Sequence, residues 1–322
     1  MQAMFPDRAL SDAVQEATAR DDVADAADLR ELDASGLGII RLDGIGALTG
    51  LRRLRLDGND IRDLRPLAEL TDLTGLFLAD NAITRIESLA GMNRLPALDL
   101  SGNAITDLAP LSSMTCLTWL DLSRNPLAHA DDITGLAFLT RIALDRTGVN
   151  VLPELAGLPR LRSLSAAGNR LTDLEPLRDA ATLRALNVRA NAIRDLSPLG
   201  GLGHLRSLDL SENPVADLSP LANLRDLHAL YIWCGRVTDV TPLRRMTGLV
   251  ELGLADNLLT DVEALEELEH LEVLFLGGNT QLAPAPGGAD PSMAITDLRG
   301  PRWRDEAIGC PPGGRPHGLG RD

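Results

Sequence analysis

Residues 205–224 read LRSLDLSENPVADLSPLANL, and this stretch decides the fold because its pattern returns along the chain every 22 residues. Leu208 and Leu210 are separated by one polar residue, which is the period of a strand with one buried face. Ser219 and Pro220 then resemble a helix cap followed by proline at the first helical position, so a short helical or 3₁₀ turn should begin there. The stretch therefore predicts one short strand and one tight turn in every 22 residues.

Asparagine follows the strand segment at nine points of this 22-residue grid. These residues, which we call the ladder, are Asn59, Asn81, Asn103, Asn125, Asn169, Asn191, Asn213, Asn257 and Asn279. An asparagine side chain both donates and accepts, so it can satisfy backbone groups where the chain turns off the strand. Counting Leu37 as a degenerate first point gives twelve units. Since one unit cannot bury its own apolar edge, neighbouring units must stack with their strands parallel.

Three positions depart from the repeated pattern. Ala166 stands where other repeats have a core leucine, and Thr147 and Gly235 replace the ladder asparagine. Either these changes are tolerated drift, or they mark a local bend or a distorted strand.

The pattern L-x-x-L-x-L-x-x-N-x-I/L/V resembles that of the leucine-rich repeat proteins. The 22-residue length and segments such as Asp217–Leu221 resemble the internalin and protein-phosphatase-1 regulatory-subunit class, over roughly residues 29–282. The resemblance implies an α/β repeat solenoid, a right-handed leucine-rich-repeat arc with a parallel β-sheet on the concave face and short helical or 3₁₀ turns on the convex face. It also implies recognition of other proteins as the usual role.

We expect three segments along the chain. Residues 1–28 should form an N-terminal cap, with an amphipathic helix that places Leu10 and Val14 on one face, and an acidic segment. Residues 29–282 carry the twelve repeats. Residues 283–322 are rich in proline and glycine, so we expect a tail that is mostly disordered and in part a degenerate cap.

Composition argues against several classes of function. Acidic residues outnumber basic ones 46 to 31, and a formal charge of -15 argues against a general binder of nucleic acid or anionic membranes. All the bases are arginine, so the lysine of a P-loop or of a Schiff base is missing. No apolar run of about 18 residues is present, so we expect no membrane insertion.

Three scattered cysteines and no visible secretory signal favour a reducing, cytoplasmic setting. A trimmed signal peptide would instead make the protein a secreted one.

Within each strand, the side chains six, four and two residues before the ladder residue should project onto the concave face. Five of the eight aromatic residues occupy these positions: Phe77, Trp119, Tyr231, Trp233 and Phe275. Large exposed aromatic side chains are costly unless a partner covers them, and Trp and Tyr dominate binding hot spots. We therefore expect these residues to contact a partner.

The same face should carry charges. We expect Asp99, Asp121 and Asp209 to share one column, and Arg53, Arg55, Arg141 and Arg189 to lie on the same face. Like charges on adjacent strands are destabilising, so a partner with a basic or mixed-charge surface would complement this face. The alternative is a solvated face whose charges are neutralised within the chain.

Small residues near the C-terminal end of the repeats suggest a notch. Gly253 lies between Tyr231 and Phe275 on neighbouring strands, and the strand spacing of about 4.8 Å would place those two rings roughly 10 Å apart. One hypothesis is that the notch receives an apolar anchor of the partner, and the alternative is that these aromatic residues pack on one another.

No residue pattern indicates catalysis. The histidines lack the paired spacing of metal ligands, and no nucleophile elbow or phosphate-binding loop occurs. We therefore predict a non-catalytic protein-protein interaction scaffold, a monomer without metal or cofactor, that binds another protein on its concave face. The alternatives are a secreted or surface adhesin of internalin type, and a regulatory subunit of a separate enzyme.

Overall fold

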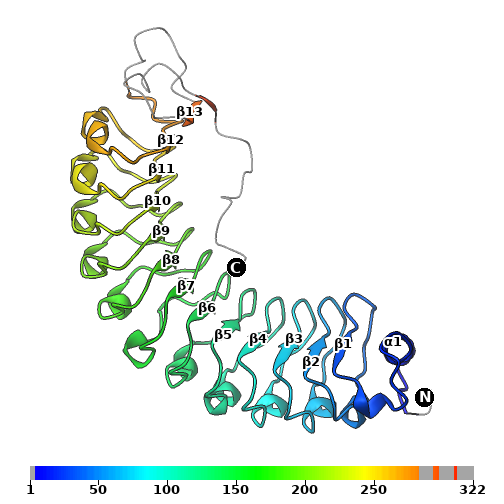
Figure 1. Ribbon diagram of the computed structural model, residues 1–322. Helices are drawn as coiled ribbons and strands as arrows, with labels where there is room; N and C mark the ends of the chain where they lie inside the picture. Colours follow the sequence, from blue (N-terminus) through cyan, green and yellow to red (C-terminus); the bar gives the residue numbers. More distant parts are fainter. Residues whose placement is uncertain (1–3, 283–292, 297–307, 310–322) are drawn as a thin grey trace. The chain divides into compact units, whose positions relative to one another are not determined.

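The computed structural model describes residues 4–282, 293–296 and 308–309. The chain divides into two compact units, Met1–Arg184 and Ala185–Asp322, which are described separately. Both units have the predicted fold class, an α/β repeat solenoid, with short parallel strands on one side of each repeat and 3₁₀ turns on the other (Figure 1).

Seven parallel strands of three residues each form the sheet of the first unit. They are β1 (Glu31–Asp33), β2 (Arg53–Arg55), β3 (Gly75–Phe77), β4 (Ala97–Asp99), β5 (Trp119–Asp121), β6 (Arg141–Ala143) and β7 (Ser163–Ser165). Each strand pairs with the next at a register of 22 residues, as between Leu98 and Leu120. The middle residue of every strand is buried, so the period-two pattern predicted the inward face correctly.

The second unit repeats this arrangement and then changes it. Its parallel strands are β8 (Ala185–Asn187), β9 (Ser207–Asp209), β10 (Ala229–Tyr231), β11 (Glu251–Gly253) and β12 (Val273–Phe275). The next strand, β13 (Met293–Thr296), pairs with β12 in the antiparallel direction, and β14 (Ile308–Gly309) pairs antiparallel with β13. The backbone of β13 therefore does not continue the parallel repeat. The rest of the 283–322 tail, and the disorder expected there, lie outside the described residues.

The strands are connected through 3₁₀ turns, as the proline positions predicted. The turns are η1 (Ala26–Asp28), η2 (Ile45–Ala47), η3 (Arg65–Leu67), η4 (Glu87–Leu89), η5 (Ala109–Ser113), η6 (Asp131–Ile133), η7 (Leu155–Gly157), η8 (Glu175–Leu177), η9 (Ser197–Leu199), η10 (Ser219–Leu221), η11 (Thr241–Arg245) and η12 (Glu263–Glu267). The sequence suggested that Ser219 caps its turn. In the structure Ser219 is instead the first residue of the turn. Its backbone N–H donates to Asp217 Oδ1 at 2.8 Å, so the preceding aspartate orders the turn.

The α-helix α1 (Arg8–Arg20) lies beside β1 at the start of the first unit (Figure 1). Leu10 and Val14 are fully buried, as the amphipathic pattern predicted. Asp7 accepts hydrogen bonds from the backbone N–H groups of Leu10, Ile40 and Arg41, which ties the helix to the first repeat. Burial opposes ionisation of Asp7, but these backbone donors hold its pKa below the ordinary value. In the part of the chain that the structure describes, no helix is both long enough and apolar enough to span a bilayer.

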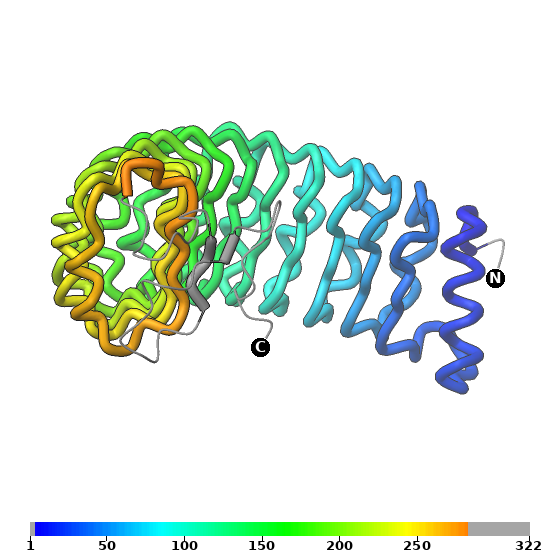
Figure 2. The backbone as a smooth tube through the Cα atoms, turned by 90° about the horizontal axis from the view of Figure 1, so that it is seen from above, coloured from blue at the N-terminus to red at the C-terminus, as the bar shows by residue number. Residues whose placement is uncertain are grey.

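The ladder asparagines bind each repeat to the one before it. Asn125 is 1 % exposed, and its Nδ2 donates to the carbonyl oxygens of Leu100 and Leu122, both at 2.9 Å. Its Oδ1 accepts from the backbone N–H of Ile105 at 3.0 Å. One side chain therefore satisfies buried backbone groups in two consecutive coils, which Figure 2 shows as successive turns of the tube.

The two ladder substitutions leave the strands in register. The hydroxyl of Thr147 donates to the carbonyl oxygen of Leu144 at 2.9 Å, so a smaller side chain keeps one of the ladder bonds. A Cβ at Gly235 would lie 2.6 Å from Oδ1 of Asn257. The Asn257 side chain therefore fills the space that the glycine leaves. The neighbouring strands β6, β7, β10 and β11 keep the 22-residue pairing. Tolerated drift therefore describes these positions better than a distorted strand does.

The residue immediately before each ladder position, which we call the αL position, has a positive φ. These residues are Gly36, Gly58, Asp80, Gly102, Arg124, Arg146, Gly168, Ala190, Glu212, Cys234, Asp256 and Gly278. Residues other than glycine lose roughly 1 kcal/mol in this conformation. Seven residues with side chains occupy this position, and five of them, Asp80, Arg124, Ala190, Glu212 and Asp256, are followed by an asparagine whose side-chain hydrogen bonds stabilise the turn.

We expect Asn125→Ala to lower the free energy of unfolding by about 3 kcal/mol, because it leaves buried backbone groups of two repeats without partners. Urea denaturation followed by circular dichroism measures the change. Asn93→Ala is the matched control, since Asn93 is exposed and lies outside the ladder. It should change stability by less than about 0.5 kcal/mol. Equal losses in the two variants would contradict the role given to the ladder.

Candidate binding face

In each strand the residues before and after the buried leucine point to the side opposite the core. Together with the residue two positions beyond the strand, they form what we call the strand face. The twelve residues predicted from sequence all occupy it. Seven of them belong to the first unit, namely Arg53, Arg55, Phe77, Asp99, Trp119, Asp121 and Arg141, and five to the second, namely Arg189, Asp209, Tyr231, Trp233 and Phe275.

Phe77 in the first unit is covered by arginines of its own chain. The guanidinium carbon of Arg55 lies 4.7 Å from the ring centroid, and that of Arg53 lies 5.8 Å away. Arg55 also forms ion pairs with Asp57 at 3.7 Å and with Asp33 at 4.0 Å. This aromatic residue and its cations are therefore already matched to one another within the unit.

Asp99 and Asp121 lie side by side in the sheet, as the sequence predicted. They are partners in the parallel register between β4 and β5, and each accepts the backbone N–H of the serine two residues later, Ser101 at 2.9 Å and Ser123 at 2.8 Å. Burial raises the pKa of both carboxyl groups, and the neighbouring aspartates, Asp121 for Asp99 and Asp145 for Asp121, raise it further. Both charges are therefore held at a cost to stability.

Three serines of the strand face contribute little exposed surface. Ser101, Ser123 and Ser211 are all buried, and Ser211 is only 1 % exposed. The oxygen of Ser211 also accepts the backbone N–H of Trp233 at 3.2 Å. These side chains support the face from below and offer little surface to a partner.

A charge pair beside this face was not predicted from the sequence. Arg124 Nη2 lies 3.0 Å from Asp80 Oδ1, and the two residues are in repeats separated by that of Gly102. A Cβ at Gly102 would overlap the same Asp80 oxygen, so the glycine leaves room for the pair. Comparison of the αL positions along the 22-residue grid would have suggested this contact, because it places Asp, Gly and Arg in consecutive repeats.

Tyr231, Trp233 and Phe275 form an aromatic cluster on the second unit. Trp233 makes edge-to-face contacts with Tyr231, with ring centroids 5.9 Å apart, and with Phe275 at 5.8 Å. A Cβ at Gly253 would overlap the indole Nε1 of Trp233. The expected notch over Gly253 is therefore wrong, because the indole already occupies it, and the alternative of mutual packing describes the rings.

The cluster is partly buried, and one of its hydrogen-bond donors has no acceptor among the residues described. The Nε1 donor of Trp233 is buried and has no acceptor among the residues described. The Tyr231 hydroxyl donates to Glu251 Oε2, and burial together with this hydrogen bond raises the pKa of the tyrosine well above its ordinary value. The tyrosine therefore stays protonated, whereas the indole is held in place by packing on Gly253.

Asp209 and Arg189 lie on the neighbouring strands of the second unit. Asp209 is paired in register with Tyr231 and accepts the backbone N–H of Ser211 at 2.9 Å. Burial raises its pKa, although Arg189 acts in the opposite direction. Arg189 itself binds Glu212, with Nε 3.0 Å from Oε1. A carboxylate next to the aromatic cluster is therefore desolvated in the same way as those of the first unit.

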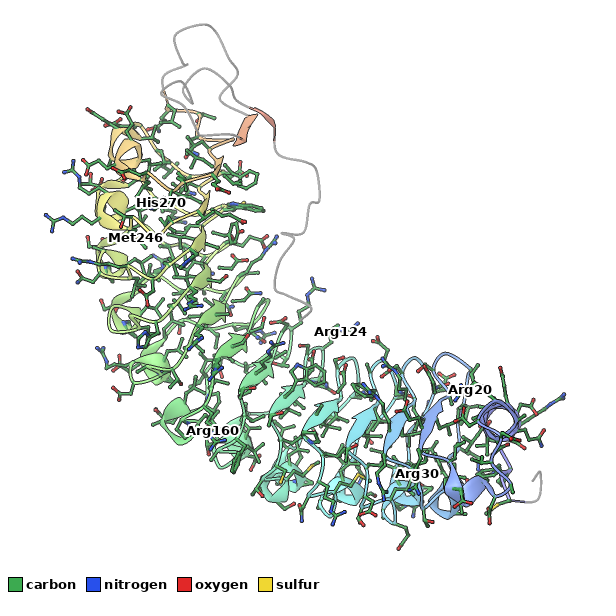
Figure 3. All side chains as sticks on the ribbon, in the orientation of Figure 1. Arg20, Arg30, Arg124, Arg160, Met246 and His270 are labelled. Atoms are coloured by element: carbon green, nitrogen blue, oxygen red, sulfur yellow. The ribbon has the colours of Figure 1, made fainter. Side chains whose placement is uncertain are left out.

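The face offers no activated nucleophile among the residues described. Burial and the nearby Asp256 raise the pKa of the Cys234 thiol, so the less reactive protonated form is favoured. The described residues also hold no group of three or more histidine, cysteine, aspartate or glutamate side chains that could bind a metal ion. The chemistry available is that of rings, carboxylates and guanidinium groups, which suits recognition. Figure 3 shows the wider context, with apolar side chains filling the space between strands and turns within each unit.

Three-residue parallel strands, 3₁₀ turns and an asparagine ladder at a 22-residue period define a solenoid of the leucine-rich repeat class. The sequence matches the family described as leucine rich repeat over residues 49–105, and the family described as leucine rich repeats in two copies over residues 181–223. The chain belongs to the leucine-rich repeat proteins, and its repeats are internalin-like.

Two similar solved structures are internalins of Listeria monocytogenes. Internalin InlF is 26% identical, with 88% of this chain and 95% of that chain covered and a TM-score of 0.74. Internalin C2 is 32% identical, with 72% and 95% covered and a TM-score of 0.55. The ectodomain of the Arabidopsis thaliana receptor kinase GASSHO1/SCHENGEN3, in complex with CASPARIAN STRIP INTEGRITY FACTOR 2, shares the fold at 24% identity, 78% and 33% coverage and a TM-score of 0.66. The search of curated proteins gives no match.

We expect Gly253→Ala to displace the Trp233 indole, because the added Cβ would overlap its Nε1. The near-ultraviolet circular dichroism of the aromatic residues should change, and overpacking should lower stability by about 1–3 kcal/mol. Gly201→Ala is the control in the same unit, since a Cβ at that position would have no heavy atom within 4 Å. An unchanged aromatic spectrum in Gly253→Ala would contradict the described position of the indole.

We expect opposite effects of Asp209→Asn and Asp217→Asn on stability at neutral pH. The pKa of Asp209 in the folded protein lies above its ordinary value of 3.8. Its ionisation therefore destabilises the fold as the pH rises from 3.8 through the raised pKa. Asparagine keeps an acceptor for Ser211 without the charge, so Asp209→Asn should be more stable than the wild type. This advantage should shrink as the pH falls through the raised pKa towards 3.8 and should be absent below 3.8.

Asp217 is the matched case within the same repeat. The hydrogen bonds from Ser219 hold its pKa below 3.8, so its charge stabilises the fold above that value and the contribution is lost on acidification. Asp217→Asn should therefore be less stable at neutral pH. Urea midpoints measured across the acid range test both expectations, and shifts of the same sign at neutral pH would contradict them.

Proposed function

We propose that this protein is a non-catalytic scaffold that binds a partner protein on its strand face. The aromatic cluster carries the proposal, because three half-buried rings lie on a face that the leucine core does not require. Aromatic residues that are rigid and partly solvent-exposed are typical anchors of protein interfaces. The leucine-rich repeat fold is generally such a scaffold, and the receptor ectodomain noted above is in complex with its factor.

The mechanism is recognition by a preorganised surface. The ladder hydrogen bonds fix the position of each repeat against the one before it, so the strand face loses little conformational entropy when a partner binds. Edge-to-face packing holds Trp233 between Tyr231 and Phe275, which restricts its rotamers before binding. Binding energy can therefore come from ring burial and from charges that are already in position.

Two settings for this function follow from different observations. Cys116 and Cys234 are exposed and unpaired, which supports the cytoplasmic setting expected from the sequence. The likeness to internalins supports the alternative of a secreted or surface adhesin. We retain the cytoplasmic scaffold as the proposal, with a monomer as the binding form.

We expect Tyr231→Ala/Trp233→Ala to abolish retention of the partner. Loss of two aromatic anchors should weaken binding by about 30-fold or more, which corresponds to about 2 kcal/mol. Affinity capture from the native host, quantified by mass spectrometry, compares this variant with the wild type. Circular dichroism verifies that the variant is folded.

Phe138→Ala is the matched control, because Phe138 is an exposed aromatic residue outside the strands, with Arg160 over its ring at 4.4 Å. It should retain the same proteins as the wild type. Recovery of the same proteins with the double variant would refute binding at the aromatic cluster.

A further inference from the structure

Two aromatic rings of the first unit, those of Phe77 and Phe138, carry an arginine on their faces. Arg55 lies over Phe77 in the first unit, with its guanidinium carbon 4.7 Å from the ring centroid. Arg160 lies over Phe138 at 4.4 Å. A cation over a ring is attracted by the negative π face, and arginine adds planar stacking. In both places, therefore, the chain supplies its own cation.

The aromatic cluster lacks this cation. Among the residues described, no arginine lies over the rings of Tyr231, Trp233 or Phe275. Arg189, which lies two residues beyond β8 and two repeats before Trp233, binds Glu212 instead. The cluster thus has the rings that elsewhere bind a guanidinium group, and the described part of the chain places no guanidinium group over them.

The surroundings of the cluster are acidic. The strand-face and αL positions of the repeats containing β9 to β12 carry four acids and no base, and the four are Asp209, Glu212, Glu251 and Asp256. Asp209 is the register partner of Tyr231, and Glu251 accepts the hydrogen bond of the tyrosine hydroxyl. Ring faces and carboxylates both attract positive charge, so the two kinds of group favour the same ligand.

We propose that the aromatic cluster, with Asp209 and Glu251 beside it, is the receptor for an arginine side chain of the partner protein. This inference rests on the proposed function and specifies the chemistry of the partner. A guanidinium group stacks on an aromatic ring and pairs with a carboxylate at the same time, whereas an ammonium group is more strongly hydrated. The interaction reproduces between two proteins what Arg55 and Phe77 do within one.

A small probe tests the site without knowledge of the partner. N-acetyl-arginine methylamide is titrated into the full chain labelled with ¹⁵N-tryptophan, and the indole N–H resonance of Trp233 is assigned by its loss in Trp233→Phe. We expect a saturable shift of this resonance. N-acetyl-citrulline methylamide, which has nearly the same shape without the charge, should bind at least about tenfold more weakly.

The carboxylates are tested with a charge-matched pair of variants. Asp209→Asn/Glu251→Gln should weaken binding of the arginine probe by about fivefold. Asp217→Asn/Glu263→Gln removes the same two charges from positions outside the strand face and should leave the binding unchanged. Equal binding of the arginine and citrulline probes would overturn the inference, and so would equal weakening in the two double variants.

The probe and the capture experiment separate this inference from the proposed function. If partner capture depends on Tyr231 and Trp233 but the arginine probe does not bind, the inference is wrong and the scaffold remains. If the probe binds as expected but capture is unaffected by the aromatic substitutions, the site exists and the proposed function fails. The lysine analogue of the probe adds a third arm, because binding as tight as that of arginine would overturn the choice of guanidinium.

Discussion

The hydrogen bonds of the ladder asparagines are the interaction on which the rest of the structure depends. Each repeat turns off its strand through a residue with positive φ, and in nine of the twelve repeats the next residue is an asparagine that satisfies backbone groups at the turn. At Asn125 one side chain does this for two repeats, through Leu100, Leu122 and Ile105. Residues two positions beyond the strand add to these bonds, because Asp57, Ser123, Asp145 and Ser211 each accept a backbone N–H of the next repeat.

The ladder does not require the other side chains of the strand face, and the two units carry different residues at these positions. The first unit covers Phe77 with Arg53 and Arg55, and a pair of adjacent aspartates follows directly, since Asp99 is the register partner of Phe77. The second unit gathers Tyr231, Trp233 and Phe275 and places acids around them. A partner of each face would therefore meet a different chemistry, although the backbone beneath is the same.

The period of the leucines predicted one short strand in each repeat and its buried face, and the 22-residue spacing predicted which residues of neighbouring strands lie side by side. The period could not predict in which direction the side chains of the strand face would point. Trp233 closes the expected notch because Gly253 has no Cβ, and Asp80 reaches Arg124 because Gly102 has none. Both contacts depend on a missing side chain in a neighbouring repeat, so they appear when the columns are compared but not when one repeat is considered alone.

The desolvated acids connect the stability of the face with recognition. Burial raises the pKa values of Asp99, Asp121 and Asp209, so the charged form of each destabilises the isolated protein. Their backbone N–H partners, from Ser101, Ser123 and Ser211, hold the carboxylates in fixed positions without neutralising them. A cation brought by a partner would interact favourably with these charges and would replace little bound water. Under the proposed function, a basic partner surface would offset the destabilisation that these charges cause in the isolated protein.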